Sequence, residues 1–179
     1  NLQDSSHLKS LFEWIYKMGK PVIAMVQGHA IAGGAGLTTV CDFAFSVPEA
    51  QFGYTEVRIG FIPAIVMVFL IRKIGETRAK ELLLSGDIVD AATAEKYAMI
   101  NKVIPSDEIE NYVTAFAAKL CAQNSGQSMA ITKKMIGDVQ HFPIAEALTF
   151  AARMNARARG SEDCKRGIAA FLNKEEITW

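Results

Sequence analysis

The chain has 179 residues, of which half are hydrophobic and 21% are charged, with 19 basic and 19 acidic side chains. This balance excludes a disordered segment and a general nucleic-acid binder, because both depend on an excess of charge. It is compatible with an anionic small molecule held by a few donors. The longest apolar run, from Ile59 to Ile71, is shorter than the about 20 residues that cross a bilayer, so we expect a buried segment and no membrane partner.

The cysteines and the N-terminal residues indicate the cellular compartment. Cys41, Cys121 and Cys164 are an odd number of cysteines at wide spacing, which favours reduced thiols over a disulfide framework. The first 20 residues alternate polar and apolar types, and they lack the apolar block of a signal peptide. We therefore expect a cytoplasmic protein.

The first half of the chain predicts an α/β layer. Leu8, Leu11, Phe12 and Ile15 have helical spacing and predict a helix capped at Ser5 or Ser6 and ended by Gly19. Residues 21–26 and 43–47 are apolar on both sides, which predicts two strands buried on both faces. A glycine-rich turn and a short helix over 37–41 separate them. The order strand, turn, helix, strand is typical of α/β folds.

The second half changes in character after Pro105. Before it, the sequence predicts an extended loop over 51–60, helices over 63–73, 76–84 and 91–99, and a last strand over 101–104. After it, only helical periodicity is found, over 109–121, 128–139, 144–159 and 162–173. We therefore predict an α/β domain over residues 1–105 and a helical region over residues 106–179. Two or three strands are few for a sheet, so earlier residues or a partner would complete the layer.

A cluster of glycines is the first candidate for a binding site. Gly28, Gly33, Gly34 and Gly36 lie between a predicted strand and a predicted helix. Such a turn brings a ligand close to the backbone, and the helix N-terminus offers amide groups to a phosphate or an oxyanion. Tight packing of helix and strand explains the glycines equally well. The pattern is neither a P-loop nor a Rossmann fingerprint, because the Gly-Lys-Ser/Thr run and the glycine spacing of those motifs are missing.

Glu56 is the second candidate, because it stands between Gly53 and Gly60 beside apolar residues. A carboxyl group in apolar surroundings suits proton transfer, although an ion pair with Arg58 or simple exposure is the more frequent arrangement. His7, His29 and His141 lack metal-ligand spacing, so we expect no metal site. A serine hydrolase is disfavoured because no Gly-x-Ser-x-Gly elbow occurs.

Together, these segments resemble the crotonase superfamily, the enoyl-CoA hydratase/isomerase family. The resemblance begins in the segment from Lys20 to Leu37 and reaches Phe171 near the end of the chain. It is carried by the runs Ala32-Gly-Gly-Ala-Gly36, Cys41-Asp42, Ala50-Gln-Phe-Gly53, Glu56, Gly60-Phe-Ile-Pro63, Ile74-Gly75, Leu84-x-Gly86 and Gly167-Ile-Ala-Ala-Phe171.

The resemblance implies a fold, an assembly and a substrate. The fold would be a crotonase-like spiral of ββα units, incomplete at its N-terminus, followed by a C-terminal helical region that forms trimers or dimers of trimers. The substrate would be an acyl-CoA thioester, as in fatty acid metabolism, with coenzyme A as part of the substrate and no separate cofactor. The residues implied to bind the substrate are Ala32, Gly34, Ile62, Pro63, Phe171 and Lys174.

The resemblance also implies a catalytic pair. The amide of Gly33 would be one of two donors to the thioester oxygen, and Glu56 would be the acid and base. The other donor would lie upstream of this chain. Many hydratases of the family carry a second glutamate where this chain has Gly36. That glycine, with the apolar segment over 64–73, resembles the branch that includes methylglutaconyl-CoA hydratases.

The leading hypothesis is therefore an enoyl-CoA hydratase that adds water reversibly to a 2-enoyl-CoA. A Δ3,Δ2-enoyl-CoA isomerase is the alternative, because it moves one proton and needs a single carboxylate. A non-catalytic assembly module with the crotonase fold is a third hypothesis. A nucleotide-binding domain is disfavoured by the poor match of the glycine spacing.

Overall fold

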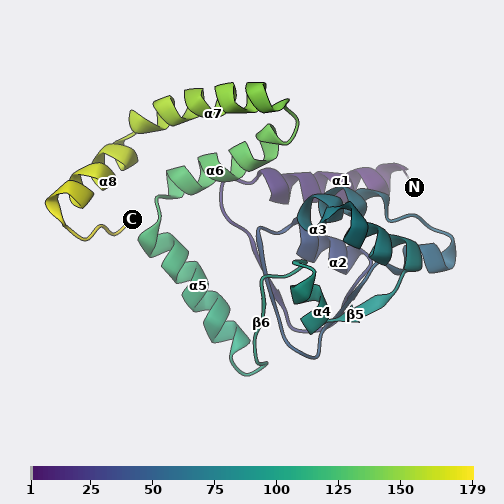
Figure 1. Cartoon of the computed structure of the whole chain (residues 1–179). Coiled ribbons are helices and arrows are strands. Elements are labelled where there is room, and N and C mark those ends of the chain that lie inside the picture. Colours follow the sequence, from purple (N-terminus) through teal and green to yellow (C-terminus); the bar gives the residue numbers. More distant parts are fainter. Residues whose placement is uncertain (1) are drawn as a thin grey trace. The chain divides into compact units, whose positions relative to one another are not determined.

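In the computed structural model, which describes residues 2–179, the chain forms two units (Figure 1). The first unit extends to Tyr16 and resumes over Val22–Ala115. The second comprises Lys17–Pro21 and Phe116–Trp179. The first unit thus continues beyond Pro105, where the sequence predicted the boundary, because it includes the beginning of the next helix.

The first unit alternates helices and strands as the sequence predicted. In chain order these elements are α1 (Leu2–Lys17), β1 (Ile23–Val26), β2 (Ala30–Ile31), α2 (Gly33–Val40), β3 (Phe43–Ser46), β4 (Gln51–Gly53), the 3-10 helix η1 (Thr55–Ile59), α3 (Ala64–Ser85), β5 (Ile88–Asp90), α4 (Ala91–Lys96) and β6 (Lys102–Val103). Within the described residues, the strands form two sheets of three strands each, in the orders β1-β3-β6 and β2-β4-β5. All pairs are parallel except β4 with β5, which is antiparallel.

Several local predictions need correction. The apolar run from Ile59 to Ile71 was expected to be a buried segment, but much of it is exposed, and Ile59 is 83% exposed. α1 begins at Leu2, so Ser5 and Ser6 lie inside the helix and do not cap it. α2 begins at Gly33, four residues earlier than the helix predicted over 37–41. The strands β2 and β5 were not predicted, because runs of two and three residues are too short to show an alternating pattern.

Apolar residues of the first unit meet between its helices and sheets. Phe12 of α1, Phe52 of β4 and Leu70 of α3 are fully buried. α3 bends at Gly75, which has φ of 77° and ψ of 166°, a conformation that an L side chain rarely adopts. The sequence predicted an interruption at this glycine, and the bend lets both halves of α3 pack within the unit.

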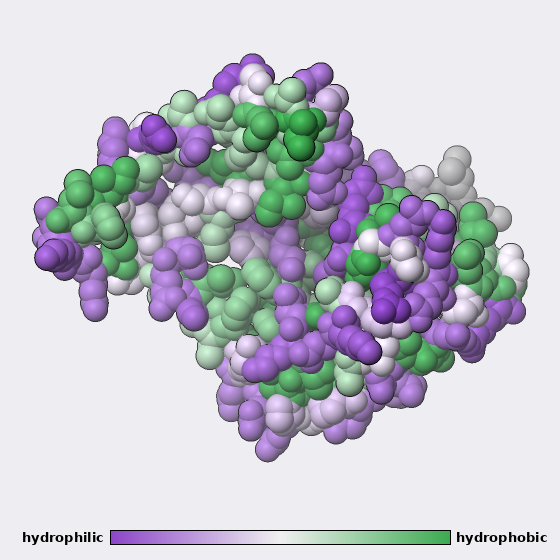
Figure 2. All heavy atoms as spheres, in the orientation of Figure 1, coloured by the Kyte–Doolittle hydropathy of each residue, from purple (hydrophilic) through white to green (hydrophobic). Residues whose placement is uncertain are grey.

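The second unit is helical, as predicted. It contains the end of α5 (Ile109–Gln123), then α6 (Gly126–Val139), α7 (Ile144–Arg159) and α8 (Glu162–Asn173). Ser125 caps α6, and its hydroxyl donates to Asp163 Oδ2 at 2.5 Å, which joins the beginnings of α6 and α8. Apolar residues remain exposed on these helices, and they gather over parts of α7 and α8 (Figure 2).

Candidate functional site

Parallel pairing of two short strands places the candidate catalytic residues at one edge of a sheet. In the β2–β4 pair, Ala30 lies opposite Phe52 and Ile31 lies opposite Gly53. Both strands end there: α2 begins with Gly33, and η1, which contains Glu56, follows β4. The amide of Ala32 donates to the carbonyl of Gly53 at 2.8 Å, which holds the two chain segments together beyond the strands. Gly33 and Glu56 therefore share the carboxyl edge of the sheet, where α/β proteins bind ligands.

The turn before α2 presents backbone amides. Ala32 has φ of 50° and ψ of −118°, which is costly for a residue with a side chain. Its carbonyl accepts from the amide of Gly36 at 3.0 Å, and this bond helps to hold the strained turn. No side chain caps α2 in the part of the chain that the structure describes. Since first-turn amides have no intrahelical partner, Gly33 is suited to donate to an oxyanion.

Glu56 is half-buried in η1, and one of its oxygens has no protein partner. Oε2 is inaccessible to solvent and makes no hydrogen bond with any described residue. The ion pair with Arg58 that the sequence left open is not formed, because the guanidinium of Arg58 pairs with Asp87 at 3.3 Å. A buried carboxylate oxygen without a partner is costly in a purely structural role, so it indicates a functional one.

Tyr54 connects these segments, although no sequence pattern singled it out. Its side chain is 0% exposed, and Oη lies 2.6 Å from Thr39 Oγ1 of α2. Burial raises the pKa of Tyr54, the hydrogen bond with Thr39 opposes this shift, and the charge of Glu56 adds to it. The phenol therefore stays protonated at neutral pH. Its pairing with a side chain fifteen residues earlier could be found only in the tertiary structure.

Lys73 is a second residue that sequence reasoning missed. Its ammonium group donates to the carbonyl oxygens of Thr39, at 3.1 Å, and Cys41, at 3.0 Å. Burial lowers the pKa of Lys73, whereas the charges of Cys41 and Asp42 oppose this shift. A cation at the end of α2 satisfies carbonyls that the helix leaves unpaired, and it complements the helix dipole.

Gly36 is the position at which the resemblance implied a second glutamate in many hydratases, and the structure leaves no room for a side chain there. A Cβ atom at this position would overlap Val66 Cγ1 of α3 and lie 3.0 Å from Phe12 Cε2 of α1. Both neighbours are buried. Among the described residues, Glu56 is the candidate carboxylate, and side chains of α1 and α3 fill the space that a second one at position 36 would need.

The other predicted residues lie in separate places. Ile62 and Pro63 line an apolar cavity of about 490 Å³ beside the start of α3. Gly34 and His29 line another cavity of about 490 Å³ along β1. Ala32 is the residue before α2.

Phe171 and Lys174 belong to the second unit. Both are exposed at the end of α8, and Phe171 is 82% exposed. Their predicted contact with coenzyme A stays a prediction.

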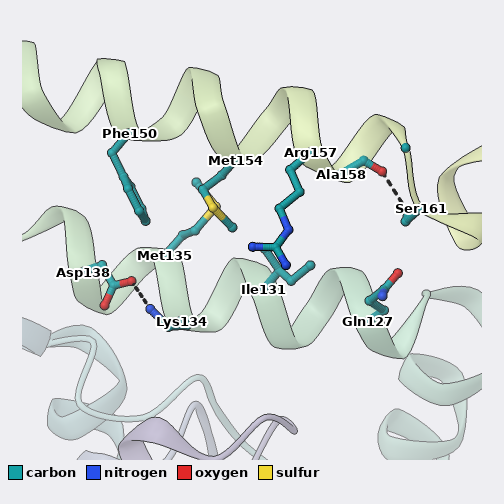
Figure 3. A pocket seen from close by; sticks show the side chains of 11 residues that line it. Gln127, Ile131, Lys134, Met135, Asp138, Phe150, Met154, Arg157, Ala158 and Ser161 are labelled. Atoms are coloured by element: carbon teal, nitrogen blue, oxygen red, sulfur yellow. Dashed lines mark hydrogen bonds and ion pairs between the residues drawn. The ribbon is translucent and has the colours of Figure 1, made fainter.

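The second unit has a cavity of its own, of about 610 Å³, between α6 and α7 (Figure 3). Met135 and Met154 point toward each other across it, and Phe150 points from α7 toward α6 (Figure 3). Lys134 and Asp138 form an ion pair at its edge. No predicted site residue lines this cavity, so it adds nothing to the candidate site.

Neither a metal-binding cluster nor a membrane-spanning helix occurs among the residues that the structure describes. The described residues contain no group of three His, Cys, Asp or Glu side chains placed to hold a metal ion. Within residues 2–179, every helix is too short or too polar to span a bilayer.

Comparison with known proteins identifies the family to which this chain belongs. The sequence model of the enoyl-CoA hydratase/isomerase family matches residues 3–179. A Thermus thermophilus protein named "Putative enoyl-CoA hydratase" is 38% identical over 174 residues, which are 97% of this chain and 68% of that protein. A crotonyl-CoA hydratase of Syntrophomonas wolfei is 31% identical over 173 residues, which are 96% of this chain and 66% of that protein.

A solved structure shows the same fold. The crystal structure of an enoyl-CoA hydratase from Shewanella pealeana matches with a TM-score of 0.92 at 30% identity, over 100% of this chain and 67% of that one. The chain thus spans about two thirds of the length of these relatives. The crotonase fold with its helical C-terminal region is thereby confirmed, and the chain belongs to the enoyl-CoA hydratase/isomerase family.

Proposed function

We propose that the protein adds water reversibly to a 2-enoyl-CoA thioester, with Gly33 as an oxyanion donor and Glu56 as the acid and base. The observation that carries the proposal is the buried Oε2 of Glu56, which lacks a protein partner at the sheet edge where Gly33 begins α2. The hydratase names of the relatives support it. The chain spans about two thirds of their length, so the activity of the whole protein is part of the proposal.

In this mechanism the thioester oxygen accepts a hydrogen bond from the Gly33 amide. A second donor is expected outside residues 1–179. Negative charge develops on this oxygen when a nucleophile adds to the β-carbon, and each fixed donor contributes about 3–4 kcal/mol to its stabilisation in comparable sites. A helix N-terminus suits this role, because its amides and its dipole are oriented before the reaction starts.

Glu56 would serve both proton transfers. It accepts a proton from water while the water oxygen bonds to the β-carbon and the π electrons move to the thioester oxygen. The enolate then collapses, and the same carboxyl group returns the proton to the α-carbon. One water molecule is consumed and the 3-hydroxyacyl thioester is formed, so a single carboxylate suffices.

A Δ3,Δ2-enoyl-CoA isomerase is a second candidate, and one observation favours it. Val66 and Phe12 fill the space beside Gly36, so a second carboxylate for activating water is missing there. Isomerisation needs one group that removes a proton from the α-carbon of a 3-enoyl-CoA and returns it to the γ-carbon. That the protein belongs to the branch that includes methylglutaconyl-CoA hydratases stays a prediction.

The test compares wild-type protein with Glu56→Gln, using a 2-enoyl-CoA and a 3-enoyl-CoA as substrates. We expect a loss of about 10²–10⁴ in turnover, because a general acid and base contributes about that factor. Glu110→Gln is the matched control, since this carboxylate is exposed on α5. Full turnover by Glu56→Gln would refute the role of Glu56.

The products separate the candidate functions. Formation of a 3-hydroxyacyl-CoA supports the hydratase, and conversion of 3-enoyl-CoA to 2-enoyl-CoA without loss of the double bond supports the isomerase. If wild-type protein neither turns over nor binds an acyl-CoA in calorimetry, the assembly module becomes the better explanation.

We also propose that the protein self-associates as a trimer or a dimer of trimers. Large apolar side chains of the second unit are exposed, among them Ile144 and Leu148 of α7 and Phe171 of α8. Exposed apolar groups of this size are typical of interfaces. A monomer in sedimentation analysis would contradict this expectation.

A further inference from the structure

A buried hydroxyl pair joins the helix that begins with Gly33 to the segment that contains Glu56. Tyr54 stands between β4 and η1, two residues before Glu56. Its Oη lies 2.6 Å from Thr39 Oγ1, and Thr39 Oγ1 lies 2.8 Å from the carbonyl oxygen of Ala35. Ala35 is two residues after Gly33, in the first turn of α2.

The direction of these hydrogen bonds follows from counting protons. A threonine hydroxyl has one proton, and donation to the Ala35 carbonyl uses it. Thr39 Oγ1 is then an acceptor toward Tyr54, so the phenol donates to Thr39 and Thr39 donates to Ala35. The Tyr54 hydroxyl also lies 3.4 Å from the Ala35 carbonyl oxygen, a longer and weaker contact in the same direction. The result is a buried chain of hydrogen bonds from the segment before Glu56 to the first turn of α2.

Packing alone does not require this hydroxyl. Phenylalanine would fill nearly the same space in the core and would bury no polar atom that needs a partner. The beginning of α2 is also joined to the end of β4 by the Ala32 amide, which donates to the Gly53 carbonyl at 2.8 Å. That bond involves the strained residue Ala32. The bonds from Tyr54 through Thr39 to Ala35 are a second connection, on the C-terminal side of Gly33. Two connections, one before and one after Gly33, would fix the orientation of the first turn of α2.

We propose that Tyr54, with Thr39 as its partner, is a positioning residue that sets the distance between the Gly33 amide and the Glu56 carboxyl group. This inference rests on the proposed function, in which both groups act on one thioester. Proton transfer and oxyanion binding need the acyl group between them, and a displacement of about 1 Å in such a geometry costs roughly 10²-fold in rate. Loss of one of the two connections should cause a smaller displacement.

The experiment measures kcat and KM for the acyl-CoA substrate in the full protein. We expect Tyr54→Phe to lower kcat about tenfold and to leave KM unchanged, because the substrate still binds while the reacting groups are misaligned. Thr39→Val should have the same effect, and the double variant should lose no more than either single one. Thr39→Ser keeps the hydroxyl group and should therefore retain most of the wild-type turnover. Tyr97→Phe is the matched control, since it removes a tyrosine hydrogen bond to Glu81 elsewhere in the first unit and should leave kcat unchanged.

Glu56→Gln separates this inference from the proposed function. If Glu56→Gln retains full turnover, or if the wild-type protein is inactive, the proposed function fails and the inference fails with it. If Glu56→Gln is impaired while Tyr54→Phe keeps its kcat or changes only KM, the positioning role is wrong and the role of Glu56 stands. An equal loss in Tyr97→Phe would also overturn the inference, because it would show a general effect of stability. In a Glu56→Gln background, Tyr54→Phe should cause no further loss.

Discussion

Replacement of Gly36 by alanine tests how tightly three helices meet behind the candidate site. The new Cβ atom would overlap Val66 Cγ1 and lie 3.0 Å from Phe12 Cε2. Val66 is 4% exposed and Phe12 is 1% exposed, so neither side chain can turn into solvent. The added methyl group must therefore push α1 and α3 away from α2.

The size of the effect follows from two opposing contributions. Overpacking a filled core costs about 1–3 kcal/mol, and we expect the upper end here because both neighbours are buried. Alanine is favoured over glycine inside a helix by about 1 kcal/mol. The free energy of unfolding should therefore fall by about 2 kcal/mol. Val66→Ala alone should also cost about 2 kcal/mol, because it removes two buried methyl groups and leaves a cavity.

The double variant provides the decisive comparison. In Gly36→Ala/Val66→Ala the new methyl group enters the space that Val66 vacated, so the total loss should be about 1 kcal/mol instead of the sum of the single losses. The resulting coupling of about 3 kcal/mol is at the upper end of the range measured for contacting pairs. The assay is urea denaturation followed by circular dichroism.

Gly34→Ala is the matched control for helix propensity. Gly34 also lies in α2, but a Cβ atom there meets nothing within 4 Å, so this variant should gain up to about 1 kcal/mol. If Gly36→Ala were as stable as wild-type protein, Val66 would have to yield easily. This result would refute the argument that Val66 and Phe12 leave no room for a second carboxylate at position 36.

Two further predictions concern Tyr54 and Lys73, which both bond to α2. The pKa of Tyr54 is raised above its ordinary value by burial, so the native state holds its proton where the unfolded chain loses it, and stability should fall as the pH rises above about 10. Denaturation between pH 8 and about 11 should show a weaker decline for Tyr54→Phe, and equal slopes for both proteins would contradict the prediction. Lys73→Met removes the donor to the carbonyl groups of Thr39 and Cys41, so we expect a loss of about 1–3 kcal/mol in thermal or urea unfolding. An unchanged stability would mean that water satisfies these carbonyls equally well.

Much of the architecture follows from local sequence patterns. Residues 21–26 and 43–47 predicted β1 and β3 because both runs are apolar throughout. Burial on both faces was predicted wrongly for β1, which is only partly buried and has Met25 37% exposed. The four helices after Pro105 were predicted because each repeats apolar residues at helical spacing. The break at Gly75 was predicted from a residue that tolerates a positive φ. The caps at Ser5 and Ser6 were predicted wrongly, since capping residues also occur inside helices.

For the candidate site too, the sequence predicted some features and not others. Gly33 and Glu56 could be selected from the sequence, because a glycine-rich helix start and a carboxylate among apolar residues are local signals, reinforced by the resemblance to the family. Their arrival at one sheet edge depends on the pairing of β2 with β4, and strands of two and three residues are too short to be predicted.

The contacts that shape the site were decided by the tertiary structure alone. Three contacts join residues 15 to 34 positions apart. They are the hydrogen bond between Tyr54 and Thr39, the bond of Lys73 to the carbonyl of Thr39 at the end of α2, and the contact of Val66 with the space beside Gly36. No periodicity marks such pairs, because each depends on how two elements pack in space. The amino-acid sequence by itself thus determined most of the helices and strands and the candidate reactive groups. The packing of these elements determined that no second carboxylate fits at position 36, and it determined which contacts hold the Gly33 turn against the segment that contains Glu56.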